Sequence, residues 1–485
     1  MNQIVIVLND RSFEYDIYTL VIAFYPGVRT SVIDPGTEPR EKPDLFVRAM
    51  IGPERIDLEA GEWKREISVV PDSDRSTYKN LIKRNLYEML RQLKGSDLPW
   101  GNLTGIRPVK LAMQYLPEGR EQAVSQMENR YYVSRKKADL AVRTALRERE
   151  ILSGIDTKNG YSLYIGIPFC PSICLYCSFS SSPYALWEKR VDEYLDALLL
   201  EMAECRSCFP GKTLHTVYIG GGTPTTLSPA QLDRLLSAVE KHFDLSHVME
   251  FTLEAGRPDS ITREKLEAIR THPVTRISVN PQTMNQKTLD LIGRRHTVED
   301  TIRAYEAARS LGYDNINMDL IVGLPGEGLE EVRHTMERIE ALDPDDVTVH
   351  ALALKRAARL ALHMDEYEKI SFQASDRIMN LCEEGCRRLN MTPYYLYRQK
   401  NMAGNFENVG YAKPDKAGLY NILIMEEVEC ILALGAAGST KIVYEDGRIE
   451  RVENVKDIRN YLERIDEMIR RKRAVCGCEE DMVHG

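Results

Sequence analysis

Residues 164–179 read YIGIPFCPSICLYCSF, and they place three cysteines directly after an apolar run typical of a buried strand. Cys170, Cys174 and Cys177 have the spacing C-x3-C-x2-C. In a long chain that does not resemble a small secreted scaffold, thiols so close in sequence are typical of metal-binding or catalytic cysteines rather than disulfides. The stretch therefore predicts a strand that leads into a loop on which three thiolates converge.

Strand-like and helix-like segments alternate around this stretch. About six such units in series predict a parallel sheet, which right-handed crossovers would curl into a full or partial barrel. The strand-like runs are YSLYIGI (161–167), TVYIGG (216–221), MEFTLEA (249–255), RISVNP (276–281), NINMDLIVGLP (315–325) and DVTVHALAL (346–354), and helices are expected after Trp187, Ser228, Thr262, Thr297 and Leu329. Barrels of this kind react at the C-terminal ends of their strands, where the cysteine loop falls.

The flanking segments have a different pattern. Short strands (3–9, 44–52, 65–71) and helices (78–95 and about 120–152) precede the alternation, and helix 366–390, an aromatic stretch and a last strand-helix segment follow it. The predicted fold class is α/β, a partial (β/α)6 barrel with an N-terminal α/β domain and a C-terminal α+β domain. The expected boundaries are 1–155 for the accessory domain, 156–350 for the barrel and 351–485 for a substrate or lid domain.

Composition narrows the class of protein. The 485 residues carry a formal net charge of -9, with acidic and basic residues mixed along most of the chain. This pattern favours neither nucleic acid nor an anionic membrane surface as a partner. No apolar stretch approaches the roughly 20 residues of a membrane span, and the N-terminus lacks the basic start and cleavage site of a secretory signal. We therefore expect a cytoplasmic protein without a membrane span.

The cysteine spacing also indicates a type of metal centre. Three thiolates on a short loop can occupy three corners of a cubane 4Fe-4S cluster and leave one iron open, whereas an electron-transfer cluster normally takes four cysteines. A closed zinc site is the alternative, but it needs a fourth Cys or His close by, and residues 178–181 supply none. The other seven cysteines are expected to be core or surface residues, although the tail pair Cys476 and Cys478 could bind a metal.

The motif C-x3-C-x2-C, with Tyr176 before the third cysteine, resembles the defining motif of radical S-adenosylmethionine (radical SAM) enzymes. In those enzymes the three cysteines hold a 4Fe-4S cluster, S-adenosylmethionine chelates the open iron, and reductive cleavage yields a radical that abstracts hydrogen. The resemblance assigns Cys170, Cys174 and Cys177 as cluster ligands and catalytic residues. YIGGGTPTTL (218–227) then resembles the loop that binds the methionine end, since its glycines permit close backbone approach and N–H donation, although alone they could serve only a tight turn.

More of the chain, roughly residues 160–440, is similar to the oxygen-independent coproporphyrinogen III oxidase (dehydrogenase) family. The segments FTLEAGRPDSIT, RISVNPQTMNQKTLDLIGRRHT and NINMDLIVGLPGE occur in that family's order, and LTGIRP and YRQKNMAGNFENVGY resemble its HemZ type. The resemblance implies contacts from Tyr164, Gly221 and Glu254 to the S-adenosylmethionine on the cluster. It implies a possible second S-adenosylmethionine at Gly222, Thr223, Tyr176, Gln282, Arg294 and Asp319.

The family's substrate is a tetrapyrrole, so the implied activity is oxidative decarboxylation of two propionates of coproporphyrinogen III to vinyls. A flavodoxin- or ferredoxin-type protein would donate electrons, and the final electron acceptor is unknown. Cationic side chains that could hold propionates are Arg294, Arg295, Lys355, Arg356 and Arg398. Tyr395, Tyr397 and Phe406 could face a tetrapyrrole, but spacing two is equally typical of a half-buried strand.

Two departures keep other functions open. Phe179 stands where the dedicated oxidase type has a further cysteine, and residues 398–412 lack the HN-x-x-YW heme motif of the heme-chaperone type. The alternatives are therefore a heme chaperone that binds heme and a 4Fe-4S cluster, or a radical SAM enzyme that acts on another tetrapyrrole such as heme.

Overall fold

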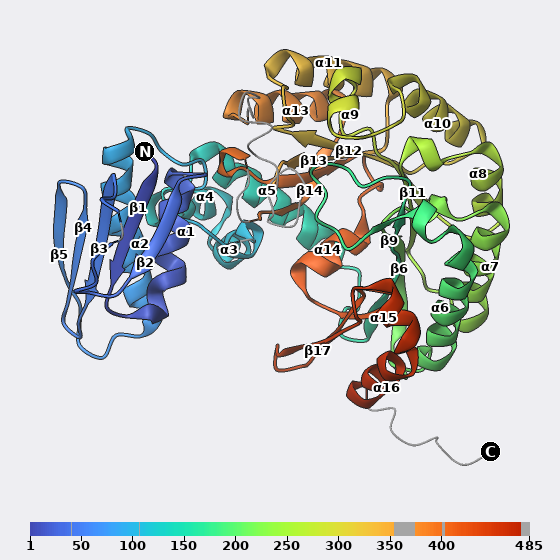
Figure 1. Cartoon of the computed structure of the whole chain (residues 1–485), viewed down its shortest axis with the longest axis horizontal. Helices are drawn as coiled ribbons and strands as arrows, with labels where there is room; N and C mark the ends of the chain where they lie inside the picture. Colours follow the sequence, from blue (N-terminus) through green and yellow to red (C-terminus); the bar gives the residue numbers. More distant parts are fainter. Residues whose placement is uncertain (40, 106, 354–373, 400–402, 477–485) are drawn as a thin grey trace. The chain divides into compact units, whose positions relative to one another are not determined.

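The computed structural model describes residues 1–485 except 40, 106, 354–373, 400–402 and 477–485. The chain forms two compact units (Figure 1). Residues 1–145 and 397–407 make unit 1, and residues 146–396 and 408–485 make unit 2. Lys355, Arg356 and Cys478 lie outside the described residues, and the division into three domains stays a prediction.

Unit 1 contains a five-stranded sheet in the order β2–β1–β3–β4–β5. Its strands are β1 (Gln3–Leu8), β2 (Arg29–Ile33), β3 (Leu45–Ile51), β4 (Arg55–Ala60) and β5 (Trp63–Ser68). β1 pairs in parallel with β2 and β3, and the remaining pairs are antiparallel. The predicted N-terminal strands are therefore present, and β2 and β4 are additional.

The core of unit 1 lies between this sheet and the helices α1 (Glu14–Phe24) and α2 (Arg75–Lys94), which bury Ile4, Leu20 and Leu86 together. α2 ends at Gly95 as predicted, because that residue adopts the left-handed conformation (φ 70°) that glycine accepts without strain. The helix expected over 120–152 is two helices, α4 (Arg120–Tyr131) and α5 (Arg135–Leu152), because Tyr132 takes φ 58° between them. The short helix α3 (Pro108–Tyr115) precedes them.

Unit 2 is built on the predicted parallel strands, which neighbour one another in chain order. They are β6 (Gly160–Ile167), β9 (Thr213–Gly221), β10 (Glu250–Gly256), β11 (Arg276–Val279), β12 (Ile316–Val322) and β13 (Asp346–Ala351). All five pairings are parallel. The sheet curves, and its helices follow the outer side of the curve in Figure 1. The α/β class and the partial barrel are confirmed.

The crossover helices are α6 (Val191–Cys205), α7 (Pro229–His242), α8 (Arg263–Arg270), α9 (Gln286–Leu291), α10 (Val298–Ser310) and α11 (Leu329–Leu342). Three of them start where the sequence indicates. The side chains of Ser228, Thr262 and Thr297 accept backbone N–H groups in the first turns of α7, α8 and α10. These caps satisfy donors that a helix start leaves unpaired, which is why they mark helix starts in sequence.

Later strands extend the same sheet at both ends. β14 (Thr392–Tyr397) and β15 (Asn408–Ala412) follow β13, while β16 (Cys430–Leu434) pairs in parallel with β6 and leads to β17 (Ser439–Val443) and β18 (Ile449–Glu453). The remaining helices are α13 (Asp376–Arg388), α14 (Leu419–Glu426), α15 (Ile458–Glu463) and α16 (Ile465–Val475). Among the described residues, no helix is both long and apolar enough to cross a membrane.

Candidate cofactor site

The three motif cysteines lie on one loop after β6. β6 ends at Ile167, and β7 (Phe169–Cys170) pairs with β8 (Ser182–Pro183) across the loop. The Cys177 N–H donates to the Cys174 carbonyl at 3.2 Å, and all three cysteines are free thiols. Burial raises the pKa of Cys177 to about 11, and the two neighbouring motif cysteines act in the same direction. The three thiols therefore share one loop and act on one another electrostatically, although among the described residues they do not form a closed group of metal ligands. Their role as cluster ligands stays a prediction.

Hydrogen-bond donors surround these sulfurs. Arg257 Nη1 lies 3.4 Å from Cys174 Sγ, and Thr223 Oγ1 lies 3.6 Å from Cys170 Sγ. The Arg294 guanidinium also interacts electrostatically with Cys174 and Tyr176. Buried cationic donors stabilise sulfur that carries negative charge, as thiolates bound to iron do. The donor set therefore fits a 4Fe-4S cluster held by the three cysteines.

The glycine loop after β9 packs on the strand that carries the cysteines. The Gly222 N–H donates to the Ile167 carbonyl at 2.7 Å, and the Thr223 N–H donates to the Phe169 carbonyl at 2.7 Å. The N–H groups of Gly222 and Thr223 are therefore paired with the cysteine strand, and the role of the glycine loop in binding S-adenosylmethionine stays a prediction. Gly221 takes φ +105°, and a Cβ there would lie 3.2 Å from the Tyr164 hydroxyl. The glycines permit close packing against the cysteine strand.

Gly222→Ala is expected to displace this strand. An added Cβ would lie 2.5 Å from the Phe169 carbonyl oxygen and 2.9 Å from that of Ile167, and backbone cannot yield cheaply. We expect at least a tenfold loss of S-adenosylmethionine affinity, measured by equilibrium dialysis on cluster-loaded protein. A tenfold loss corresponds to a change of only about 1.4 kcal/mol in the binding free energy. Gly154→Ala is the control, because a Cβ there meets nothing within 4 Å. Equal affinity in both variants would contradict the packing role.

Tyr164 and Glu254 lie in one partly buried group with two further tyrosines, of which Tyr420 is buried. Tyr218 stacks on Tyr420 with ring centroids 4.4 Å apart, and Tyr164 stacks on both at 6.2 and 6.4 Å. The Tyr218 hydroxyl donates to Glu254 Oε1. Two residues expected to contact S-adenosylmethionine are thus brought together, although their roles stay predictions. Tyr218 and Tyr420 were not predicted.

Glu254 has an altered affinity for its proton. Burial raises the pKa of its carboxyl group to about 7, the hydrogen bond from Tyr218 works against this, and the Asp319 carboxylate adds to the rise. Asp319 in turn lies 3.8 Å from the His350 imidazole and accepts a hydrogen bond from Asn317 at 2.8 Å. At neutral pH Glu254 is therefore close to half protonated before any ligand binds.

This pKa predicts a pH effect on stability. The carboxyl holds its proton in the folded chain up to about pH 7 but loses it near pH 4.5 when unfolded, so folding stability falls as the pH rises between these values. In Glu254→Gln this carboxyl group is absent, so the free energy of unfolding should fall less with rising pH than in the wild-type protein. The difference should be up to about 3 kcal/mol, which is the free energy equivalent of the pKa difference. Thermal unfolding of cofactor-free protein at pH 5 and pH 8 tests this. An equal change in unfolding temperature between pH 5 and pH 8 in the wild-type protein and in Glu254→Gln would contradict this prediction.

The other predicted contacts meet at the same edge of the sheet. Gln282 takes φ 66°, and its N–H donates to the Asp319 carbonyl at 2.9 Å. Arg294 Nη1 donates to the Asn280 carbonyl at 2.5 Å. Gln282 Oε1 and Arg294 Nε are buried without a hydrogen-bond partner among the described residues. Such buried polar atoms are compatible with a polar ligand here, and the second S-adenosylmethionine stays a prediction.

Several proposed propionate and tetrapyrrole contacts are occupied or buried. Arg398 is 4% exposed and donates to the Leu103 carbonyl at 2.6 Å and to Asn405, within unit 1. Tyr395 lies in β14 and is buried, as the strand interpretation expected, and Phe406 is 3% exposed. Arg295 is exposed. Arg398 is therefore bound to protein groups rather than presented to a substrate.

Sequence reasoning also missed Arg257, which carries no motif of its own. It stands in the segment FTLEAGRPDSIT directly after a strand, and an arginine at the C-terminal end of a barrel strand was the available signal.

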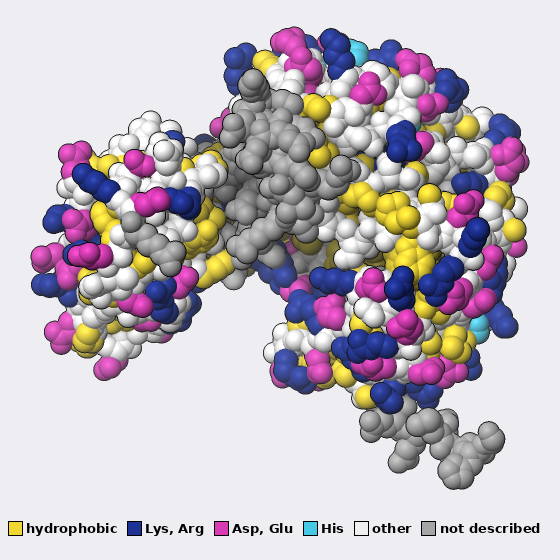
Figure 2. Space-filling view, in the orientation of Figure 1, with side chains coloured by type: hydrophobic (Ala, Val, Ile, Leu, Met, Phe, Trp, Pro, Cys, Tyr) yellow, Lys and Arg dark blue, Asp and Glu magenta, His cyan; other side chains and the backbone are white. Residues whose placement is uncertain are grey.

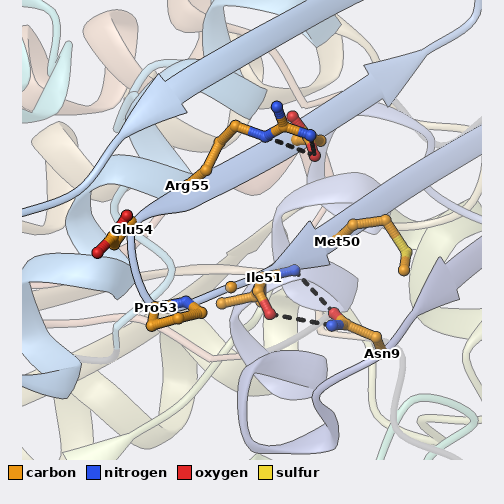
Figure 3. Close-up of a pocket in the computed structure, with 8 residues that line it drawn as sticks. Asn9, Met50, Ile51, Pro53, Glu54 and Arg55 are labelled. Atoms are coloured by element: carbon orange, nitrogen blue, oxygen red, sulfur yellow. Dashed lines mark hydrogen bonds and ion pairs between the residues drawn. The ribbon is translucent and has the colours of Figure 1, made fainter. Parts of the chain in front are cut away.

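A separate pocket of about 410 Å³ in unit 1 is lined by the β3–β4 turn and contains none of the predicted site residues (Figure 3). There Asn9 pairs with the backbone of Ile51.

Comparison with known proteins shows which family has this sequence and fold. Residues 164–339 match the radical SAM superfamily. The chain is 39% identical over 397 residues to the oxygen-independent coproporphyrinogen-III oxidase-like protein HemZ of Bacillus subtilis (strain 168), covering 80% of this chain and 79% of that protein. It is 38% identical over 195 residues to the heme chaperone HemW of the same strain, covering 40% and 51%. The coproporphyrinogen III oxidase HemN of Escherichia coli shares the fold, with TM-score 0.52 and 24% identity over 66% of this chain and 73% of that one.

A curved parallel sheet with three cysteines after its first strand is the arrangement of radical SAM proteins. The chain belongs to the radical SAM superfamily and, within it, to the oxygen-independent coproporphyrinogen III oxidase-like family of the HemZ type. Its cofactors are a 4Fe-4S cluster and S-adenosylmethionine.

Proposed function

We propose that the chain is a radical SAM oxidoreductase that oxidatively decarboxylates two propionates of coproporphyrinogen III to vinyls, giving protoporphyrinogen IX. The observation that carries this proposal is the loop of three free cysteines with the Arg257 guanidinium against Cys174, in a chain similar over most of its length to a coproporphyrinogen-III oxidase-like protein. An unactivated β C–H bond resists any protein acid or base at neutral pH, so radical chemistry suits this substrate.

The reaction balances for each propionate. The side chain loses one hydrogen atom from its β carbon, then carbon dioxide and one electron, and a vinyl group remains. The cluster and S-adenosylmethionine, when bound, supply the 5'-deoxyadenosyl radical that takes the hydrogen atom. A flavodoxin- or ferredoxin-type donor would supply the reducing electron, and an acceptor still unidentified would take the substrate electron.

The chain's own residues would bind and orient the cofactors. Cys170, Cys174 and Cys177 would hold the cluster, and Tyr164 with Glu254 would position S-adenosylmethionine. Cys174 is 7% exposed, so the loop itself limits access of water to its sulfur. Restricting water at this site would protect a carbon radical from side reactions.

The test is an anaerobic reaction of reconstituted, reduced protein with S-adenosylmethionine and coproporphyrinogen III, followed by mass spectrometry. Two losses of carbon dioxide are expected, each with two hydrogens, because one hydrogen atom goes to the 5'-deoxyadenosyl radical and the carboxyl hydrogen leaves as a proton. Each loss should be matched by one 5'-deoxyadenosine. Formation of 5'-deoxyadenosine with unchanged porphyrinogen would reject this substrate and direct the search to heme or another tetrapyrrole.

A heme chaperone is the second candidate. The matches to HemW proteins favour it, and so does Phe179, which is 72% exposed where the dedicated oxidase type has a cysteine. Tight heme binding without consumption of S-adenosylmethionine would support the chaperone. Consumption that depends on coproporphyrinogen III would exclude it.

A further inference from the structure

Arg257 is a buried arginine that points at one of the motif sulfurs. It follows β10 directly and is 4% exposed. Its Nη1 donates to the Ser172 carbonyl at 3.0 Å and approaches Cys174 Sγ at 3.4 Å. One guanidinium nitrogen thus contacts both the backbone and a sulfur of the cysteine loop.

Asp259 fixes the orientation of this guanidinium. Arg257 Nε donates to Asp259 Oδ1 at 2.9 Å, and Nη2 donates to Oδ2 at 2.6 Å. A two-point pair of this kind holds the planar fork in one orientation. The Nη1 edge is therefore left facing the cysteine loop.

The charges around Cys174 do not balance without an anion. Arg294 is 5% exposed, and its positive charge also interacts with Cys174, so two guanidinium charges act on one sulfur. Asp259 is paired with one of them, and His296, 4.0 Å from Asp259 and 1% exposed, brings no negative charge. A buried excess positive charge is costly unless an anionic group compensates it. A thiolate-bound cluster supplies that negative charge.

We propose that Arg257 is a positioning residue that holds Cys174 and raises the reduction potential of the cluster, with Asp259 moderating the effect. This inference rests on the proposed ligand role of Cys174. Reduction adds negative charge to the cluster, so a cation bonded to a ligand sulfur favours the reduced form. The Asp259 carboxylate is negative and lies on the other side of the Arg257 guanidinium from the cysteine loop. Removing its charge must therefore raise the reduction potential, opposite to the effect of removing Arg257.

The experiment is an EPR-monitored redox titration of reconstituted protein, with iron content measured on the same samples and no substrate present. At the wild-type midpoint, Arg257→Met is expected to lower the ratio of reduced to oxidised cluster about tenfold, or ~59 mV for one electron. Asp259→Asn should raise the ratio. Arg263→Met, whose exposed partner is Glu267, should change nothing.

The opposite signs separate charge tuning from loosened structure. If Arg257→Met fails to load iron, Asp259→Asn decides: a higher ratio of reduced to oxidised cluster supports the proposal, and an unchanged or lower ratio overturns it. Unchanged midpoints in loaded variants, or shifts of the same sign for Arg257 and Asp259 variants, overturn it. Wild-type protein that holds no cluster would instead reject the proposed function.

Discussion

Cys174→Ala is expected to yield a folded protein that holds no stable 4Fe-4S cluster and produces no 5'-deoxyadenosine. Cys174 is the sulfur that Arg257 contacts, and its removal leaves two protein ligands for a cubane. We expect the iron content and the brown absorption to fall to background and cleavage of S-adenosylmethionine to fall by at least a thousandfold, a loss of about 4 kcal/mol of transition-state stabilisation.

The matched control for this loss is Cys382→Ala. Cys382 is also buried, at 1% exposed, but lies in α13 and outside the motif. Its substitution removes a similar volume of side chain, so it reports what a buried cysteine contributes by packing alone. A Cys174 variant that retains four irons per chain or cleaves the cofactor would refute the ligand assignment.

The sequence predicts the centre of the fold well because its signals there are local. A strand-like run followed by a helix-like run occurs in each βα unit, and in three units Ser228, Thr262 and Thr297 cap the helices that the sequence indicates. Right-handed crossovers then leave one order for parallel strands. The cysteine loop falls at the C-terminal edge as a consequence of that order.

What the sequence does not predict depends on distant contacts. β16 joins β6 across more than 260 residues, from Tyr161 to Cys430, and no local pattern encodes that pairing. In the sequence, Arg257 has the pattern of a surface arginine, and only the fold brings it against Cys174.

The charges visible in Figure 2 are mixed in sign on the face shown, which matches the mixed charge of the sequence but identifies no site.

Trp100 and Glu407 illustrate the same limit in unit 1. Trp100 has no exposed surface, and its indole N–H donates to Glu407 Oε2 at 2.7 Å. The other oxygen, Oε1, accepts from Lys137 Nζ at 2.6 Å. These three residues are separated by up to 307 positions in the chain. The segment 397–407 therefore belongs to the compact unit formed by residues 1–145.

Lys137→Met is expected to destabilise unit 1 by about 3–5 kcal/mol, because it leaves the Glu407 carboxylate buried without its cation. The side chains of this pair are 3% and 1% exposed, so water cannot replace the lost partner without structural change. Differential scanning calorimetry should show an earlier transition. Arg135→Met is the control on the same helix, since its partners Glu121 and Glu128 are more exposed and such surface pairs contribute about 0–1 kcal/mol.

The double variant Lys137→Met/Glu407→Gln decides whether the unpaired charge is the cause. Its amide oxygen can still accept from Trp100, but no charge remains buried, so most of the lost stability should return. No recovery would mean that Lys137 acts through packing, for example over the Phe406 ring, 5.2 Å away.

The contacts of Glu407 also affect how a deletion of the N-terminal residues would be interpreted. Removing residues 1–150 also removes Trp100 and Lys137, which are both partners of Glu407. A loss of activity in such a protein therefore reports on the unsupported segment 397–407 as well as on the missing N-terminal residues.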